Sequence, residues 1–138
     1  MIGVDIIVIA RIEKSLGRFG ARFLARFLCE DEIAALSKRD FSPRSVAGFW
    51  AAKEACAKAL GVGIGDRLRF HDMCVSYAPA GAPNMRLDSR KCEEFGAGEI
   101  ALSISHDGGF AIAVVAIEKS HRASGATHCI GKRSISSS

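Results

Sequence analysis

Apolar residues recur along this chain with two periods, one typical of strands and one typical of helices. The opening stretch "IGVDIIVIA" is short and rich in β-branched residues, which predicts a buried strand. Apolar positions then run from Ile12 to Phe27 at spacings of four, three, four and four. This spacing predicts an amphipathic helix, loosened near Gly17 and Gly20. The next stretch, "CEDEIAALSK", predicts a shorter helix with acidic residues in its first turn.

The clearest helix signal lies between residues 42 and 61. Ser42 suits the N-cap, Pro43 the first turn and Gly61 the C-terminal stop. Farther along, "LRFHDMCVSYA" predicts a strand, "PAGAPNM" a turn and "KCEEFGAG" a short helix. The stretches "IALSISH" and "FAIAVVAIE" flank the turn "DGG" and predict a hairpin. Together these elements predict one small α/β or α+β domain.

The pattern is lost from Lys119 onward. The segment "KSHRASGATHCIGKRSISSS" has no apolar periodicity and is rich in Ser, Gly and basic residues, so we expect a disordered tail over residues 119–138. The domain itself is expected to span residues 1–118. A chain of 138 residues with 49% hydrophobic content can build a core. With so few strands, we expect a partner subunit to complete that core.

Composition narrows the classes of partner. A net charge of +4 suits an acidic partner or a phosphorylated ligand and is too small for a nucleic-acid-binding arm. The longest apolar run, residues 110–117, is too short to span a bilayer, and the N-terminus has no basic leader. We therefore expect a cytoplasmic protein without membrane or nucleic-acid partners. Five cysteines without a CxxC pair indicate reduced thiols, and neither a disulfide framework nor a zinc knuckle.

Charged residues interrupt two of the most apolar stretches. Asp5 lies inside the opening strand, where an ionised carboxylate is costly unless a cation or several donors face it. Trp50, Glu54 and Lys58 follow at intervals of four, so they share one helix face, and Lys53 points about 100° away. A strand-edge aspartate and a surface Glu–Lys pair are the structural alternatives. Two carboxylates could instead hold Mg²⁺, with Lys58 and the following "GVGIG" facing phosphate.

Three stretches resemble a known family. "GVDI" followed by an Arg-bearing helix, "FWAAKEACAKALGVGI" and "LSISHDGGFAIAVV" occur in the order and spacing typical of holo-acyl-carrier-protein synthases, the small 4′-phosphopantetheinyl transferases. The resemblance covers about residues 1–118. It implies an antiparallel-containing sheet packed with helices, assembled as a homotrimer with active sites at the subunit interfaces. It also implies transfer of 4′-phosphopantetheine from coenzyme A (CoA) to a serine of apo acyl carrier protein, with release of 3′,5′-ADP, in fatty acid biosynthesis.

The resemblance also implies roles for individual residues. Asp5 and Glu54 would bind Mg²⁺, which bridges to the CoA pyrophosphate, and Lys58 would contact the phosphates. The serine proton would pass to a metal-bound water or to Glu54, and the sequence leaves this choice open. The other implied contacts are with CoA, by Gly61, Val62, Gly63, Pro83 and His106, and with the carrier protein, by Arg11, Arg18 and Arg22.

Two departures from the family pattern concern the coenzyme. Phe49 stands where an arginine is usual and Val62 where a threonine is frequent, so we expect weaker CoA contacts. A structural hydrogen bond is the alternative role for His106. Two other functions stay open: a non-catalytic module that binds an acidic protein through the Arg-bearing helix, and a structural trimer with an inactive metal site. The first has no use for Asp5 and Glu54, and only Phe49 favours the second.

Overall fold

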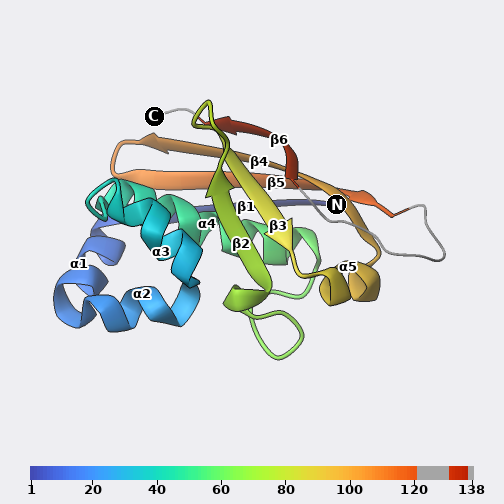
Figure 1. Ribbon diagram of the computed structural model, residues 1–138, viewed down its shortest axis with the longest axis horizontal. Helices are drawn as coiled ribbons and strands as arrows, with labels where there is room; N and C mark the ends of the chain where they lie inside the picture. The colour runs from blue at the N-terminus through green and yellow to red at the C-terminus, as the bar shows by residue number, and fades with distance from the viewer. Residues whose placement is uncertain (121–130, 137–138) are drawn as a thin grey trace.

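The computed structural model describes residues 1–120 and the strand at 131–136, which form a mixed helix and sheet fold (Figure 1). One sheet has the strand order β1-β5-β4-β6, with antiparallel pairs except for the parallel β4–β6 pair, and β2 and β3 form a separate antiparallel pair. The predicted α/β (α+β) class with an antiparallel-containing sheet is confirmed. The strands are β1 (Ile2–Val8), β2 (Met73–Tyr77), β3 (Pro83–Leu87), β4 (Ala97–Asp107), β5 (Phe110–Lys119) and β6 (Gly131–Ser136).

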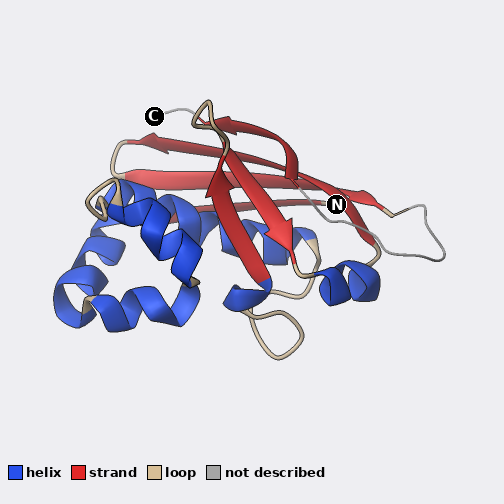
Figure 2. Cartoon of the chain, viewed as in Figure 1, coloured by secondary structure: helices blue, strands red, loops and turns tan. Residues whose placement is uncertain are grey.

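The helices gather on one side of the four-stranded sheet (Figure 2). The longest of them, α4, packs against β1 and β5. It begins as predicted, because the Ser42 hydroxyl accepts a hydrogen bond from the Ser45 N–H at 3.2 Å and Pro43 occupies the first turn. The helices are α1 (Ile9–Phe19), α2 (Ala21–Phe27), α3 (Glu30–Ser37), α4 (Pro43–Ala59) and α5 (Ser89–Phe95), with a 3-10 turn η1 (Phe70–Asp72) before β2.

Small residues bring β1 and α4 into direct backbone contact. A Cβ added at Gly3 would overlap the carbonyl oxygen of Ala55, so only glycine allows the strand to lie this close to the helix. The alanines of α4 have small side chains, so the helix can also approach the strand closely. Side chains alternate along a strand, so Asp5 lies on the same face of β1 as Gly3 and is held against α4.

Three predicted elements differ in detail from the structure. The helix expected over residues 12–27 is divided at Gly20, whose φ of 52° and ψ of −127° end α1 and start α2 at a corner. Gly17, by contrast, lies inside α1 and stays helical. The strand predicted from "LRFHDMCVSYA" begins only at Met73, after η1, and β3 starts at Pro83, inside the segment predicted as a turn.

The end of the chain also differs from the expectation. Residues 131–136 form β6, where the sequence predicts a disordered tail. This strand pairs in parallel with β4 and takes up backbone hydrogen-bonding groups at that sheet edge. Residues 121–130 and 137–138 lie outside the described residues, and the prediction is untested there.

Four of the five cysteines belong to the described part of the chain. Cys29, Cys56 and Cys74 are free thiols, as predicted. Burial raises the pKa of Cys56 to about 12, which keeps this thiol protonated at neutral pH. Cys92 is disulfide-bonded, so the prediction of reduced thiols throughout the chain is wrong for this residue.

The sheet face opposite α4 is apolar and exposed, and we call it the outer sheet face. Ile2 and Ile6 on β1 are 75% and 58% exposed. Patches of this kind on a small domain usually mark interaction surfaces. The outer sheet face consists of Ile2, Val4, Ile6 and Val8 on β1 and Phe110 and Val114 on β5.

Among the described residues, no helix has the length and apolar character needed to cross a bilayer.

Candidate active site

Three of the residues singled out in the sequence meet where β1 crosses α4. The Lys58 ammonium donates a hydrogen bond to Oδ1 of Asp5 at 2.9 Å. Burial raises the pKa of Glu54, the negative charge of Asp5 raises it further, and the positive charge of Lys58 opposes both effects. Asp5, Glu54 and Lys58 therefore form one electrostatic cluster, as the sequence predicts, although their roles in it remain predictions.

The two carboxylates of this cluster suit a hard divalent cation. They come from a strand and a helix in backbone contact, so their positions are fixed by the packing of β1 on α4. Mg²⁺ commonly takes one or two protein carboxylates and fills its other positions with water and phosphate oxygens. The repulsion between Asp5 and Glu54 that raises the Glu54 pKa is the repulsion that a cation would relieve. The donor set therefore fits Mg²⁺.

The chain that leaves α4 passes beyond Lys58 and offers open backbone. The N–H groups of Val62 and Gly63 both donate to the carbonyl of Ala57, at 3.3 Å, and fold the turn back on the helix end. A Cβ built at Gly61 or Gly63 would meet no atom within 4 Å. A ligand could therefore lie directly against this turn, which is consistent with the predicted CoA contacts of residues 61–63.

The other two predicted CoA contacts lie at the opposite end of α4. Pro83 and His106 line one cavity of about 30 Å³, next to Gly48. His106 Nε2 donates to the carbonyl of Arg44 at 3.0 Å, the structural hydrogen bond considered as its alternative role. Gly48 precedes Lys58 by ten residues, which corresponds to about 15 Å along a helix. One chain therefore presents its predicted CoA contacts in two separate groups.

Phe49, which stands where the family has an arginine, is a packing residue. Its side chain is fully buried, and its ring centroid lies 5.5 Å from that of Tyr77. The Arg39 guanidinium stacks 3.9 Å from the Tyr77 ring centroid and lines the same small cavity as His106. Arg39 thus places a positive charge near this cavity, although position 49 itself has none.

The three arginines predicted to contact the carrier protein are all exposed. Arg11 and Arg18 lie on α1 and Arg22 lies on α2. The corner at Gly20 means that they do not form the single helical stripe that the sequence suggested. The Arg18 guanidinium lies 5.2 Å from the ring centroid of Phe19, which is 45% exposed. This surface therefore combines positive charge with an exposed aromatic ring.

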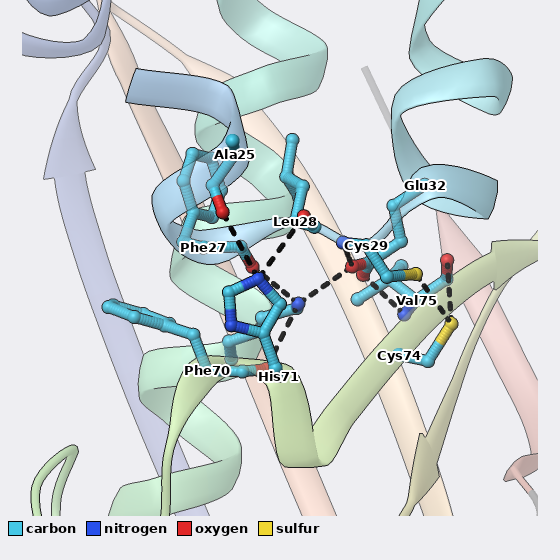
Figure 3. A network of polar contacts seen from close by, with 10 residues as sticks. Ala25, Phe27, Leu28, Cys29, Glu32, Phe70, His71, Cys74 and Val75 are labelled. Atoms are coloured by element: carbon cyan, nitrogen blue, oxygen red, sulfur yellow. Dashed lines mark hydrogen bonds and ion pairs between the residues drawn. The ribbon is translucent and has the colours of Figure 1, made fainter. Parts of the chain in front are cut away.

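Sequence reasoning missed a buried polar network beside the active-site helix (Figure 3). Lys53 is fully buried, and its ammonium donates to the carbonyl of Phe27 at 2.6 Å and of Phe70 at 3.1 Å. It also donates to Oε1 of Glu32 at 2.8 Å, and this carboxylate is fully buried as well. Lys53 therefore joins α4 to the end of α2, to α3 and to η1.

Glu32 extends this network to β2. Its Oε1 also accepts the N–H of Cys29 at 2.9 Å, and its Oε2 accepts the N–H of Val75 at 2.8 Å.

The spacing of apolar residues in the sequence could have revealed that Glu32 and Lys53 are buried. Glu32 stands four residues before the fully buried Leu36, and Lys53 stands four residues after the fully buried Phe49. A charge at such a position lies on the apolar face of its helix.

Comparison with known proteins gives a consistent result. Residues 1–115 match the family model of the 4′-phosphopantetheinyl transferase superfamily. A holo-[acyl-carrier-protein] synthase of Sulfurimonas denitrificans is 51% identical over 118 residues, which cover 86% of this chain and 94% of the relative. That of Helicobacter pylori strain P12 is 54% identical over 121 residues, which cover 88% of this chain and 100% of the relative.

Solved structures with this fold carry the same enzyme name. The crystal structure of Helicobacter pylori holo-[acyl-carrier-protein] synthase in complex with coenzyme A matches with a TM-score of 0.80 and 49% identity, over 86% of this chain and 100% of the other. The enzyme from Neisseria meningitidis matches with a TM-score of 0.78 and 31% identity, over 86% and 97% of the two chains. The family match includes the residues of the Asp5–Glu54–Lys58 cluster.

Proposed function

The chain belongs to the holo-acyl-carrier-protein synthases of the 4′-phosphopantetheinyl transferase superfamily, and from this premise we propose its full reaction. A serine hydroxyl of an apo acyl carrier protein attacks the β-phosphorus of CoA. The new bond joins the serine oxygen to phosphorus, the pyrophosphate bond breaks, and 3′,5′-ADP leaves. Family membership favours this enzyme over the non-catalytic module considered from the sequence. We propose fatty acid biosynthesis as its setting, since the acceptor is an acyl carrier protein.

The observation that supports this chemistry in the chain itself is the Asp5–Glu54–Lys58 cluster. Asp5 and Glu54 would hold Mg²⁺, whose charge offsets the negative charge that develops on the phosphoryl oxygens. The Lys58 ammonium, already 2.9 Å from Asp5, would contact a phosphate. A metal-bound water and the Glu54 carboxylate are the two candidates to receive the serine proton.

Intact-mass spectrometry tests the proposed reaction. We expect an apo acyl carrier protein incubated with the enzyme, CoA and Mg²⁺ to gain one phosphopantetheine arm, and EDTA to abolish this gain. Binding of CoA without transfer to any of several carriers would contradict the proposal and favour a trimer with an inactive metal site.

We propose that the chain works as a homotrimer with its active sites between subunits. Two observations support this. On the outer sheet face Ile6 is 58% exposed, and an exposed apolar patch of this kind typically packs against another subunit. The CoA contacts of one chain fall into two groups at opposite ends of α4, so a neighbour could complete each site.

We propose the cytoplasm as the location of the protein. The free thiols at Cys29, Cys56 and Cys74 suit a reducing compartment, although the disulfide at Cys92 does not.

Mixed trimers test the shared site. We expect coexpression of Asp5→Ala and His106→Ala chains to restore activity above that of either variant alone. In equal mixtures, about one quarter of the interfaces would join an intact Asp5 to an intact His106. Activity in the mixture no higher than the average of the two parents would show that each site lies within one chain. Sedimentation of the wild-type protein, expected at three subunits, provides the control for assembly.

Charge reversal tests the carrier-docking surface. We expect Arg18→Glu to raise KM for the carrier protein by about tenfold and to leave KM for CoA nearly unchanged, since only the acidic partner would meet this charge. Arg90→Glu, at an exposed position on α5, is the matched control and should change neither constant. Equal changes in both constants for Arg18→Glu would show that this surface does not dock the carrier.

A further inference from the structure

A second group of metal-ligating side chains lies outside the proposed active site. Cys29 joins α2 to α3, Glu32 lies in the first turn of α3, and Cys74 lies on β2 (Figure 3). The two sulfur atoms are 3.8 Å apart. One ligand atom from each of the three residues lies within 4.8 Å of the others. We propose that this cluster binds a soft metal ion, Zn²⁺ or the chemically similar Cd²⁺, through two thiolates and the Glu32 carboxylate.

The distance between the sulfurs suits one tetrahedral ion. Two Zn–S bonds of about 2.3 Å at a tetrahedral angle place their sulfurs about 3.8 Å apart. Cys29 and Cys74 already have this spacing, so an ion could bind without movement of α3 relative to β2. A disulfide would require the sulfurs to approach to about 2.05 Å, which demands rotation of the side chains.

Glu32 has a coordination position left for an ion. Its Oε1 is shared between Lys53 and the N–H of Cys29, and its Oε2 accepts one hydrogen bond, from Val75. A carboxylate oxygen has two lone pairs, so Oε2 can also bind a metal. The ammonium of Lys53 offsets the charge of Glu32, and the two thiolates would offset the charge of a divalent ion.

The electrostatic surroundings favour a cation at the thiols. The carboxylate of Glu32 places a negative charge within 4.8 Å of both sulfur atoms. A bound metal supplies the missing positive charge and displaces the thiol protons. The affinity is therefore expected to increase with pH.

The site is open enough for an ion to enter. Cys29 and Cys74 are both partly exposed. A cavity of about 550 Å³ opens beside Cys74, and Asp31 and Ser76 also line it. A water molecule from this cavity could fill the fourth position. The ligands differ in softness from those of the Asp5–Glu54 pair, because thiolates prefer Zn²⁺ and Cd²⁺ whereas carboxylates prefer Mg²⁺.

Cadmium titration of the full-length protein tests this site. With the thiols kept reduced by a phosphine, we expect one equivalent of Cd²⁺ to produce a thiolate-to-metal charge-transfer band in the ultraviolet. Cys29→Ser and Cys74→Ser should each weaken binding at least tenfold. Cys56→Ala, which removes a free thiol buried on α4, is the matched control and should keep the band. Zn²⁺ should abolish the band in competition, and a large excess of Mg²⁺ should not.

Several results would overturn the proposal. They are the absence of the band in reduced protein, its survival at full strength in Cys29→Ser or Cys74→Ser, and its loss on addition of Mg²⁺. Alkylation and mass analysis that show Cys29 joined to Cys74 under these reducing conditions would also overturn it. An unchanged Zn²⁺ affinity in folded Glu32→Gln protein would overturn the assignment of the carboxylate as a ligand.

Discussion

Glu54→Gln is expected to reduce phosphopantetheine transfer by about 10³-fold or more, because loss of a metal carboxylate removes several kcal/mol of transition-state stabilisation. Glutamine keeps the size of the side chain and removes the charge. Asp5→Asn should have a similar effect. Because the raised pKa of Glu54 shows that burial and Asp5 already disfavour its charge, the substitution should not destabilise the fold. Transfer to an apo acyl carrier protein can be followed by intact-mass spectrometry.

Glu93→Gln provides the matched control, since it makes the same change at an exposed position on α5. Its transfer rate should equal that of the wild-type enzyme. Raising the Mg²⁺ concentration should restore part of the activity of Glu54→Gln if the carboxylate acts by binding the ion. Wild-type rates in both Glu54→Gln and Asp5→Asn would contradict the assignment of the metal site.

Most of the fold could be predicted because its elements have local signals. The strand β1, the helix α4 with its Ser42 cap and the β4–β5 hairpin follow from apolar periodicity and turn residues. The corner at Gly20 was harder to predict, because a glycine inside a helical pattern can stay helical, as Gly17 does. The strand β6 has no signal of its own, since its pairing depends on a sheet edge supplied by β4.

The sequence predicts the Asp5–Glu54–Lys58 cluster better than it predicts the position of His106. Asp5, Glu54 and Lys58 come together because β1 packs on α4, and the small residues at Gly3 and Ala55 are visible in the sequence. The separation of His106 from this cluster depends on how β4 meets the start of α4, and no local pattern carries that information. The same holds for the Glu32–Lys53 pair, which joins elements distant in sequence.

Lys53→Met is expected to lower the free energy of unfolding by about 3–5 kcal/mol, the usual cost of removing one partner from a buried ion pair. Methionine keeps the length of the side chain, but the carboxylate of Glu32 and the carbonyls of Phe27 and Phe70 then lose their donor. Urea unfolding at one fixed protein concentration measures the change, because oligomer stability varies with concentration. Lys91→Met, which removes a lysine paired with Glu94 near the surface, is the matched control and should lose much less.

The double variant Lys53→Met/Glu32→Gln separates the buried charge from the lost packing. The glutamine introduced by Glu32→Gln is neutral and still offers a carbonyl oxygen to one of the backbone N–H groups that Glu32 accepts from Cys29 and Val75. If an uncompensated charge causes most of the loss, the double variant should be more stable than the sum of the single changes predicts. Strict additivity, or a loss in Lys53→Met no larger than in Lys91→Met, would show that the ion pair does not hold α2, α3 and β2 against α4. A positive coupling would show that the Glu32–Lys53 interaction helps to fix α4, the helix that also carries Glu54 and Lys58.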